Sequence, residues 1–199
     1  MPKKKSEVNS SPPAPLDLPA GVKLLRTLRG HTDIIGRIAW APDGRMLASP
    51  SADKTIRLCD PRTGECVRVL NGHKDSVWTA AFDPTGRVLG SGCDDGTINL
   101  WEPASGRLIR TLKKHAGAVC AIAFDPAGRT LASASKDGRI NLFETATGRL
   151  LRTLKGQKHG FNDVSFDRAG RALVGGSDGG LTSYFPAQNS AANYFVFRR

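Results

Sequence analysis

The chain has 199 residues and a formal net charge of +11, and 39% of its residues are hydrophobic. That composition suits one soluble globular domain, with no membrane association, because no run approaches the roughly 18 apolar residues that a spanning helix needs. The N-terminus also lacks the apolar core of a secretory signal. The four cysteines (Cys59, Cys66, Cys93 and Cys120) form no C-x-x-C pair, so we expect no metal, no cofactor and free thiols in the cytoplasm.

Residues 1–21 are rich in proline, serine and lysine and have no hydrophobic period. We predict a disordered arm for this stretch. Its three lysines, Lys3, Lys4 and Lys5, are interpreted as a solvated run, with a nuclear address or a phosphate-binding tail as the alternatives.

Residues 22–28, with the sequence VKLLRTL, are predicted to form a β-strand that precedes the first complete unit of a repeat. The repeat has a constant period along the chain. It relates His31, His73 and His115; Trp40, Phe82, Phe124 and Phe166; and Gly44, Gly86, Gly128 and Gly170. Because the register is kept from unit to unit, the pattern predicts four equivalent structural units.

Each unit has the signals of four short antiparallel strands. In the second unit, SVWTAAF, RVLGSGC, TINLWE and RLIRTL are β-prone stretches separated by the turn sequences DPTG, DDG and PASG. No helical period interrupts them. Small sheets that are apolar on both faces must pack against one another, and radial packing of such sheets makes a propeller. The sequence therefore predicts an all-β fold.

These units resemble the WD-repeat family, on the evidence of Gly72-His73 and Trp101-Glu102 in the second unit. The near-identical repeats, with sequences such as DPAGR and TGRLLRTLKG, resemble its bacterial members. The resemblance implies a β-propeller array of four four-stranded blades. We expect an arm at residues 1–21 and repeats at about 24–66, 67–108, 109–150 and 151–185. A divergent tail at 186–199 follows, in which NYFVF at 193–197 is a candidate last outer strand.

The resemblance also implies a buried hydrogen-bonded tetrad in each blade. The second unit supplies His73, Ser91, Asp95 and Trp101. The first supplies His31, Ser49 and Asp53, and the third supplies His115, Ser133 and Asp137. A catalytic Ser-His-Asp triad is the alternative, but recurrence in several units favours a structural staple over catalysis.

Other units depart from this pattern. The first has Cys59 in place of the tryptophan and places Pro50 in a central strand, where proline removes a ladder hydrogen bond. The third has Phe143 in place of the tryptophan. The fourth has lost the tetrad, with Gln157, Gly175, Gly179 and Phe185 at its positions. We therefore expect the ends of the array to be its weakest parts.

An open arc of four blades would expose an apolar sheet face at each end. We consider four arrangements that would cover these faces. In the first, the chain is a shortened product or the end of a larger assembly, and in the second, two copies form an eight-bladed ring as a homodimer by exchanging residues 22–28. In the third, another propeller chain completes the ring, and in the fourth, the chain closes as a four-bladed ring.

Lysine and arginine outnumber aspartate and glutamate by 29 to 18. We attribute much of this excess to protection of sheet edges, because Arg26, Arg68, Arg110 and Arg152 repeat on the outermost strand. Binding to nucleic acid is the alternative, with Lys113, Lys114, Lys155 and Lys158 as the candidate cluster.

In the family, partners dock on a rim formed by the loops and turns at one side of the disc. Trp78 is the candidate anchor there, since its counterparts are Gly36, Cys120 and Asn162, although it could equally fill space between blades. Lys74, Asp75, Asp94 and Lys136 are the polar candidates beside it. We expect a non-catalytic scaffold for protein–protein interaction, as the sensing or scaffold part of a larger assembly. The alternatives are a nucleic-acid-binding module and a fragment without independent function.

Overall fold

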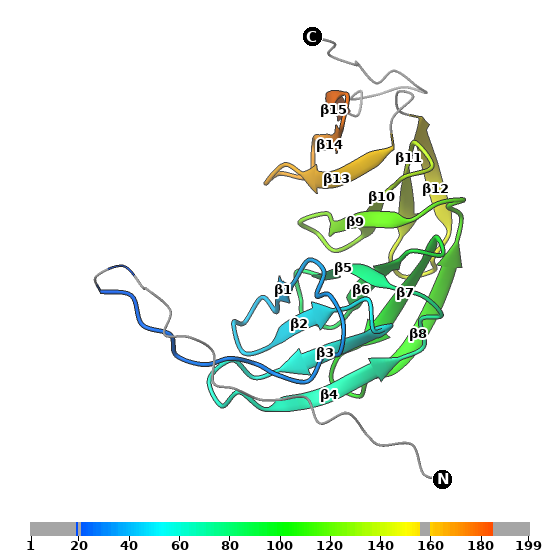
Figure 1. Cartoon of the computed structure of the whole chain (residues 1–199). Coiled ribbons are helices and arrows are strands. Elements are labelled where there is room, and N and C mark those ends of the chain that lie inside the picture. Colours follow the sequence, from blue (N-terminus) through cyan, green and yellow to red (C-terminus); the bar gives the residue numbers. More distant parts are fainter. Residues whose placement is uncertain (1–18, 20, 156–159, 185–199) are drawn as a thin grey trace.

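The computed structural model describes residue 19, residues 21–155 and residues 160–184. These residues form four antiparallel sheets that follow one another along an arc (Figure 1). The prediction of an all-β propeller array is confirmed. Among the described residues, no helix is long and apolar enough to cross a bilayer. The predicted arm at 1–21, apart from residues 19 and 21, and the predicted tail at 186–199 lie outside the described residues.

The first two blades each contain four strands in the order in which they occur in the chain. The first blade contains β1 (Ala39–Trp40), β2 (Leu47–Pro50), β3 (Thr55–Cys59) and β4 (Cys66–Asn71). The second contains β5 (Val77–Phe82), β6 (Leu89–Cys93), β7 (Thr97–Glu102) and β8 (Arg107–Lys113). The first strand of each blade lies on the inside of the arc and the last on the outside (Figure 1).

The third blade repeats this order, and the fourth has three strands among the described residues. The third contains β9 (Val119–Phe124), β10 (Thr130–Ser135), β11 (Arg139–Glu144) and β12 (Leu150–Lys155). The fourth contains β13 (Phe161–Phe166), β14 (Leu173–Ser177) and β15 (Gly180–Tyr184).

The core consists of three hydrophobic clusters, one between each pair of neighbouring blades. Between the first and second blades, the preceding blade contributes Ala48, Ile56, Leu58 and Leu70, and the following blade contributes Val77, Ala80, Leu89 and Trp101. The cluster between the second and third blades contains Ile98, Leu100, Leu112, Val119, Ile122, Leu131 and Phe143. Because many of these positions are one repeat period apart, the repeat in the sequence is a repeat of interfaces.

The first blade is distorted at its inner strand, and Pro50 explains why. In the second blade, the matching position Gly92 pairs with Thr79, whereas Pro50 has no N–H to donate to the equivalent residue, Arg37. The Arg37 backbone instead donates to the Trp78 carbonyl at 2.8 Å and forms a parallel bridge with Thr79. The chain leaves its own sheet here and pairs with the inner strand of the next blade.

Gly36 makes this close approach possible. A Cβ atom at that position would lie 2.8 Å from the Trp78 carbonyl carbon, closer than real Cβ atoms come to other atoms. Only glycine fits this position without a backbone shift. The distortion at Pro50 and the close approach at Gly36 together therefore determine the position of Arg37.

The prediction of a strand at residues 22–28 is wrong for the described structure. This segment has no strand assignment, because no neighbouring backbone pairs with it. All four cysteines are free thiols, including Cys59 and Cys66, which lie opposite each other in the pairing of β3 with β4.

Candidate protein-interaction site

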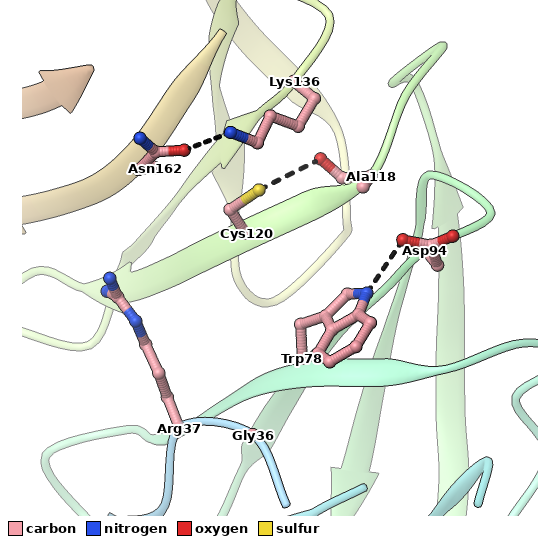
Figure 2. A pocket seen from close by; sticks show the side chains of 8 residues that line it. All are labelled: Gly36, Arg37, Trp78, Asp94, Ala118, Cys120, Lys136 and Asn162. Carbon is pink, nitrogen blue, oxygen red and sulfur yellow. Dashed lines mark hydrogen bonds between the residues drawn. The ribbon is translucent and has the colours of Figure 1, made fainter. Parts of the chain in front are cut away.

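A pocket of about 520 Å³ lies where the inner ends of the four blades meet (Figure 2). Its lining includes the same repeat position from every blade: Gly36, Trp78, Cys120 and Asn162. Arg37, Asp94, Ala118 and Lys136 complete it. We refer to these eight residues as the axial pocket. Three of the five predicted partner-binding residues, Trp78, Asp94 and Lys136, therefore lie together.

Trp78 is the one large aromatic side chain among the residues that line the axial pocket. It lies near the start of β5, half-buried, and its indole Nε1 donates a hydrogen bond to Asp94 Oδ1 at 2.8 Å. Asp94 lies in the turn that follows β6, and its backbone N–H donates to the Ser76 carbonyl at 2.9 Å. The ring is thus held by its polar end while its apolar body lines the pocket.

The opposite wall of the axial pocket is polar. Lys136 Nζ donates to Asn162 Oδ1 at 2.5 Å, and its nearest carboxylate oxygen, on Asp178, is 4.0 Å away. Asn162 in turn donates from Nδ2 to Asp178 at 2.5 Å. This chain of contacts joins the turn after β10 to the fourth blade, so the wall spans two blades.

Arg37 was not predicted from the sequence. Its guanidinium contacts Asp163 Oδ1 at 2.5 Å, and this ion pair links the first blade to the fourth. The two residues occupy the same repeat position, but Thr79 and Ala121 stand there in the middle blades, so the repeat gives no sign of a charged pair. Both side chains are about half exposed.

Cys120 supplies the pocket's sulfur atom. Its thiol donates to the Ala118 carbonyl over 3.8 Å, and burial raises its pKa despite the nearby positive charges of Lys136 and Arg37. A thiol with a raised pKa is protonated near neutral pH and is a poor nucleophile. It therefore contributes apolar surface to the pocket.

The other two predicted partner-binding residues lie outside the axial pocket. Lys74 lines a separate, smaller cavity with Asp95 and Lys113. The Asp75 carboxylate accepts a hydrogen bond from the Ser76 backbone at 2.9 Å, in a local turn. The predicted rim residues thus separate into two groups.

In the first and third blades, the side chains predicted to form the staple lie within hydrogen-bond distance of one another. His31 Nδ1 lies 2.8 Å from Asp53 Oδ2, and its Nε2 lies 2.8 Å from Ser49 Oγ. In the third blade, His115 Nδ1 lies 2.9 Å from Asp137 Oδ2 and Nε2 lies 2.8 Å from Ser133 Oγ. Each carboxylate also accepts a backbone N–H bond from the residue after the histidine.

The second blade, which has the family tryptophan, is arranged differently. Ser91 Oγ accepts a hydrogen bond from Trp101 Nε1 at 2.8 Å and lies 2.6 Å from His73 Nε2. Asp95 binds Thr97 instead, through its hydroxyl at 2.6 Å and its backbone N–H at 3.0 Å. Within the described part of the chain, His73 Nδ1 has no hydrogen-bond partner.

Burial shifts the pKa values of two of the histidines, and hydrogen bonds shift those of two of the aspartates. It lowers the pKa of His73 to about 4, although the charge of Asp95 opposes the shift, and it lowers the pKa of His115 in spite of Asp137. Hydrogen bonds hold the pKa values of Asp53 and Asp137 below normal against the opposing effect of burial.

Ser91 and Ser133 have no exposed surface, so a substrate cannot reach these two hydroxyl groups, while Ser49 is half-buried. Because the same arrangement recurs in the first and third blades, it suits a structural staple better than a catalytic triad. The described residues also contain no group of three or more histidine, cysteine, aspartate or glutamate side chains that could hold a metal ion.

Comparison with known proteins identifies the repeat. The sequence profile of the WD domain, G-beta repeat, matches residues 22–60, 64–102, 106–144 and 148–182. Coronin-7 of Rattus norvegicus is 49% identical over 47 residues, and coronin-7 of Homo sapiens is 46% identical over 48 residues. Each alignment spans 24% of this chain and about 5% of the relative's length. Since the family profile covers most of the chain, the protein belongs to the WD-repeat family.

Proposed function

We propose that this protein is a non-catalytic cytoplasmic scaffold that binds a protein partner through the axial pocket, as the sensing or scaffold part of a larger assembly. WD repeats imply a protein-interaction role, and the observation that carries the proposal is the convergence of four equivalent repeat positions on one pocket. A repeat position that faces the axis is free to vary without loss of the core, so one blade can carry a tryptophan there.

The composition of the axial pocket favours a protein as its ligand. A half-buried tryptophan surrounded by polar groups is the usual form of an interface anchor. Charges of both signs, from Arg37, Lys136 and Asp94, surround Trp78. A partner with one apolar side chain and flanking polar groups would match this arrangement better than a uniformly charged polymer.

Two arginines at the repeated outer position, Arg26 and Arg68, weaken the nucleic-acid alternative. Arg26 Nη1 donates to the Thr63 carbonyl at 2.7 Å, and Arg68 donates to the Ala104 carbonyl. These guanidinium groups contact turns of the next blade, so part of the net positive charge serves contacts between blades. A repeated outer-strand arginine is thus explained without a phosphate ligand.

The test is affinity capture from a cell extract, quantified by mass spectrometry, with the 199-residue chain, its Trp78→Ala variant and a matched control. Leu108→Ala removes an exposed apolar side chain from β8, away from the pocket. We expect at least one protein to be enriched equally by the chain and the control, and to fall at least about tenfold with Trp78→Ala.

Three results would contradict the proposal. They are a partner that Trp78→Ala retains, a partner that both variants lose to the same extent, and recovery that disappears after nuclease treatment. The last would favour the nucleic-acid alternative, in which binding also weakens steeply as salt rises.

A further inference from the structure

The outer strands of the first two blades each contact a glycine in the turn of the next blade. A Cβ atom on Gly106 of the second blade would lie 3.3 Å from Leu70 Cδ2 and 3.4 Å from Arg68 Cδ, both on β4. Arg110 and Leu112 on β8 meet Gly148 of the third blade in the same way. An arginine and a leucine two positions apart on the outer strand therefore mark its contact with the following blade.

Residues 22–28 make this contact with the first blade. A Cβ atom on Gly64 would lie 3.3 Å from Arg26 Cδ and 3.8 Å from Leu28 Cδ2, and Arg26 Nη1 donates to the Thr63 carbonyl at 2.7 Å. Arg26 and Leu28 precede Arg68 and Leu70 by one repeat period. This segment thus occupies the place of the outer strand of a blade that would precede the first.

The pentapeptide LLRTL occurs twice in the chain and provides an internal comparison. At residues 150–154 it is part of β12 and pairs with β11, whereas at residues 24–28 it pairs with no described strand. Leu151 is 43% exposed, and its counterpart Leu25 is 87% exposed. The same sequence therefore forms the fourth strand of a blade at residues 150–154 and an unpaired segment at residues 24–28.

The fourth blade has the opposite deficiency. Among the described residues it contains only β13, β14 and β15, and the edge of β15 that faces away from β14 has no partner. In the second and third blades, that edge pairs with the outer strand. One end of the described arc thus has an outer-strand segment without a sheet, and the other has a sheet whose outer strand is not among the described residues.

The two ends lie apart in the molecule, since residues 22–28 run beside the first blade and β15 lies at the far end of the arc (Figure 1). A second copy presents both ends in the same form, and it can supply residues 22–28 to β15 and β15 to residues 22–28. We propose that two copies associate head to tail, with residues 22–28 of each copy pairing with β15 of the other.

The register follows from the complete blades. Ile140 lies opposite Leu154, Asn141 opposite Thr153, and Leu142 opposite Arg152. Translated by the repeat period, Thr182 of one copy lies opposite Leu28 of the other, Ser183 opposite Thr27, and Tyr184 opposite Arg26. Two such pairings related by a twofold axis close the assembly.

The same association covers the apolar face of the first blade. Ile35, Ile38 and Trp40 are exposed there, while their repeat counterparts in the other blades pack in the clusters between blades. The fourth blade of the second copy would supply the missing neighbour. This proposal concerns self-association and does not depend on a partner in the axial pocket.

The first test is the absolute mass of the purified chain by size-exclusion chromatography with light scattering, over a range of concentrations. We expect a species of twice 21.3 kDa for the chain, and a shift to the monomer for Ile38→Asp. The control Leu108→Asp, which places the same charge on an exposed position of β8 in the second blade, should remain dimeric. Circular dichroism establishes that each variant keeps its strands.

The second test identifies the strands that pair. A chain with Thr27→Cys and Ser183→Cys should form a covalent dimer on oxidation, reversed by reducing agent, while each single variant should not. A monomer at every concentration measured, a dimer unaffected by Ile38→Asp, or an intramolecular cross-link in the double variant would each overturn the proposal. The last result would indicate closure of a single chain.

Discussion

The middle of the arc and its first blade carry the same residue pattern but differ in exposure. Ile122 in the third blade is 6% exposed, whereas its counterpart Ile38 in the first blade is 55% exposed. Ile122 packs between two blades, and Ile38 has no preceding blade beside it among the described residues. The repeat therefore determines which face of a blade is apolar, while a neighbouring blade determines whether that face is buried.

The loss of stability caused by a substitution should therefore depend on the blades beside that position rather than on the residue type. In an array where each unit contacts only the adjacent units, the free energy of unfolding is largely a sum of interface terms. Substitutions at matched positions of the middle and the end of the arc separate this explanation from one based on residue type alone.

The largest difference is expected for a buried charge. Ile122→Asp should lower the free energy of unfolding by more than about 3 kcal/mol, because the carboxylate enters a dry cluster. Ile38→Asp in the monomeric state, at low protein concentration, should lower it by less than about 1 kcal/mol. Urea titration followed by circular dichroism measures both, and equal losses would contradict the comparison.

Substitution of a staple aspartate should destabilise the protein more in a blade where the aspartate contacts the histidine than in a blade where it does not. Asp137→Asn should cost about 1–3 kcal/mol, because it weakens the charged partner of His115 Nδ1 and of the Ala116 N–H. Asp95→Asn should cost less, since Asp95 makes no hydrogen bond with His73 among the described residues. Thermal unfolding of the two variants gives the order, and a larger loss for Asp95→Asn would be inconsistent with it.

Acid should destabilise the protein in two stages. The unfolded chain binds a proton at each histidine below pH about 6.5, but folded His73, with a pKa of about 4, does not. Stability should therefore fall by about 2 kcal/mol between pH 7 and pH 5 from this residue alone. A further loss below pH about 4 follows from the lowered pKa values of Asp53, Asp95 and Asp137.

Denaturant titrations at a series of pH values measure this dependence. His73→Gln should flatten the profile between pH 7 and pH 5 relative to the unsubstituted chain. A stability that stays constant or rises over that interval would show that His73 is protonated in the folded state.

The smallest effect is expected for the ion pair that joins the first and fourth blades. Asp163→Asn should change the free energy of unfolding by no more than about 0.5 kcal/mol, because both side chains are about half exposed and water screens them. Arg37→Gln is the matched partner variant. A loss for either variant well beyond the range of exposed ion pairs would mean that this contact, rather than the apolar clusters, holds the arc.

Much of the fold could be predicted because the constant repeat period reflects the packing of equivalent blades against one another. The repeated apolar positions of the second, third and fourth blades pack against the preceding blade, and their spacing in the sequence predicted the four blades. Trp78 stood out for the same reason, since a position with glycine, cysteine and asparagine elsewhere does not belong to a core.

Features that depend on a local exception could not be predicted from the repeat. Pro50 diverts the backbone of Arg37 to the second blade, and this displacement places the arginine at the axial pocket. Lys74 and Asp75 were grouped with Trp78 by chain position, but the strand alternation and turn geometry direct them elsewhere. His73 and Asp95 matched the pattern in type, although the carboxylate binds Thr97.

Site-specific photo-cross-linking tests the claim of a protein-binding axial pocket most directly. Trp78 is replaced by a photoreactive phenylalanine analogue in one sample and Leu108 in another, and each is irradiated in cell extract. The account predicts a cross-linked protein of defined mass, other than a second copy of this chain, from position 78 and not from position 108. No product at position 78, or the same product from both positions, would contradict it.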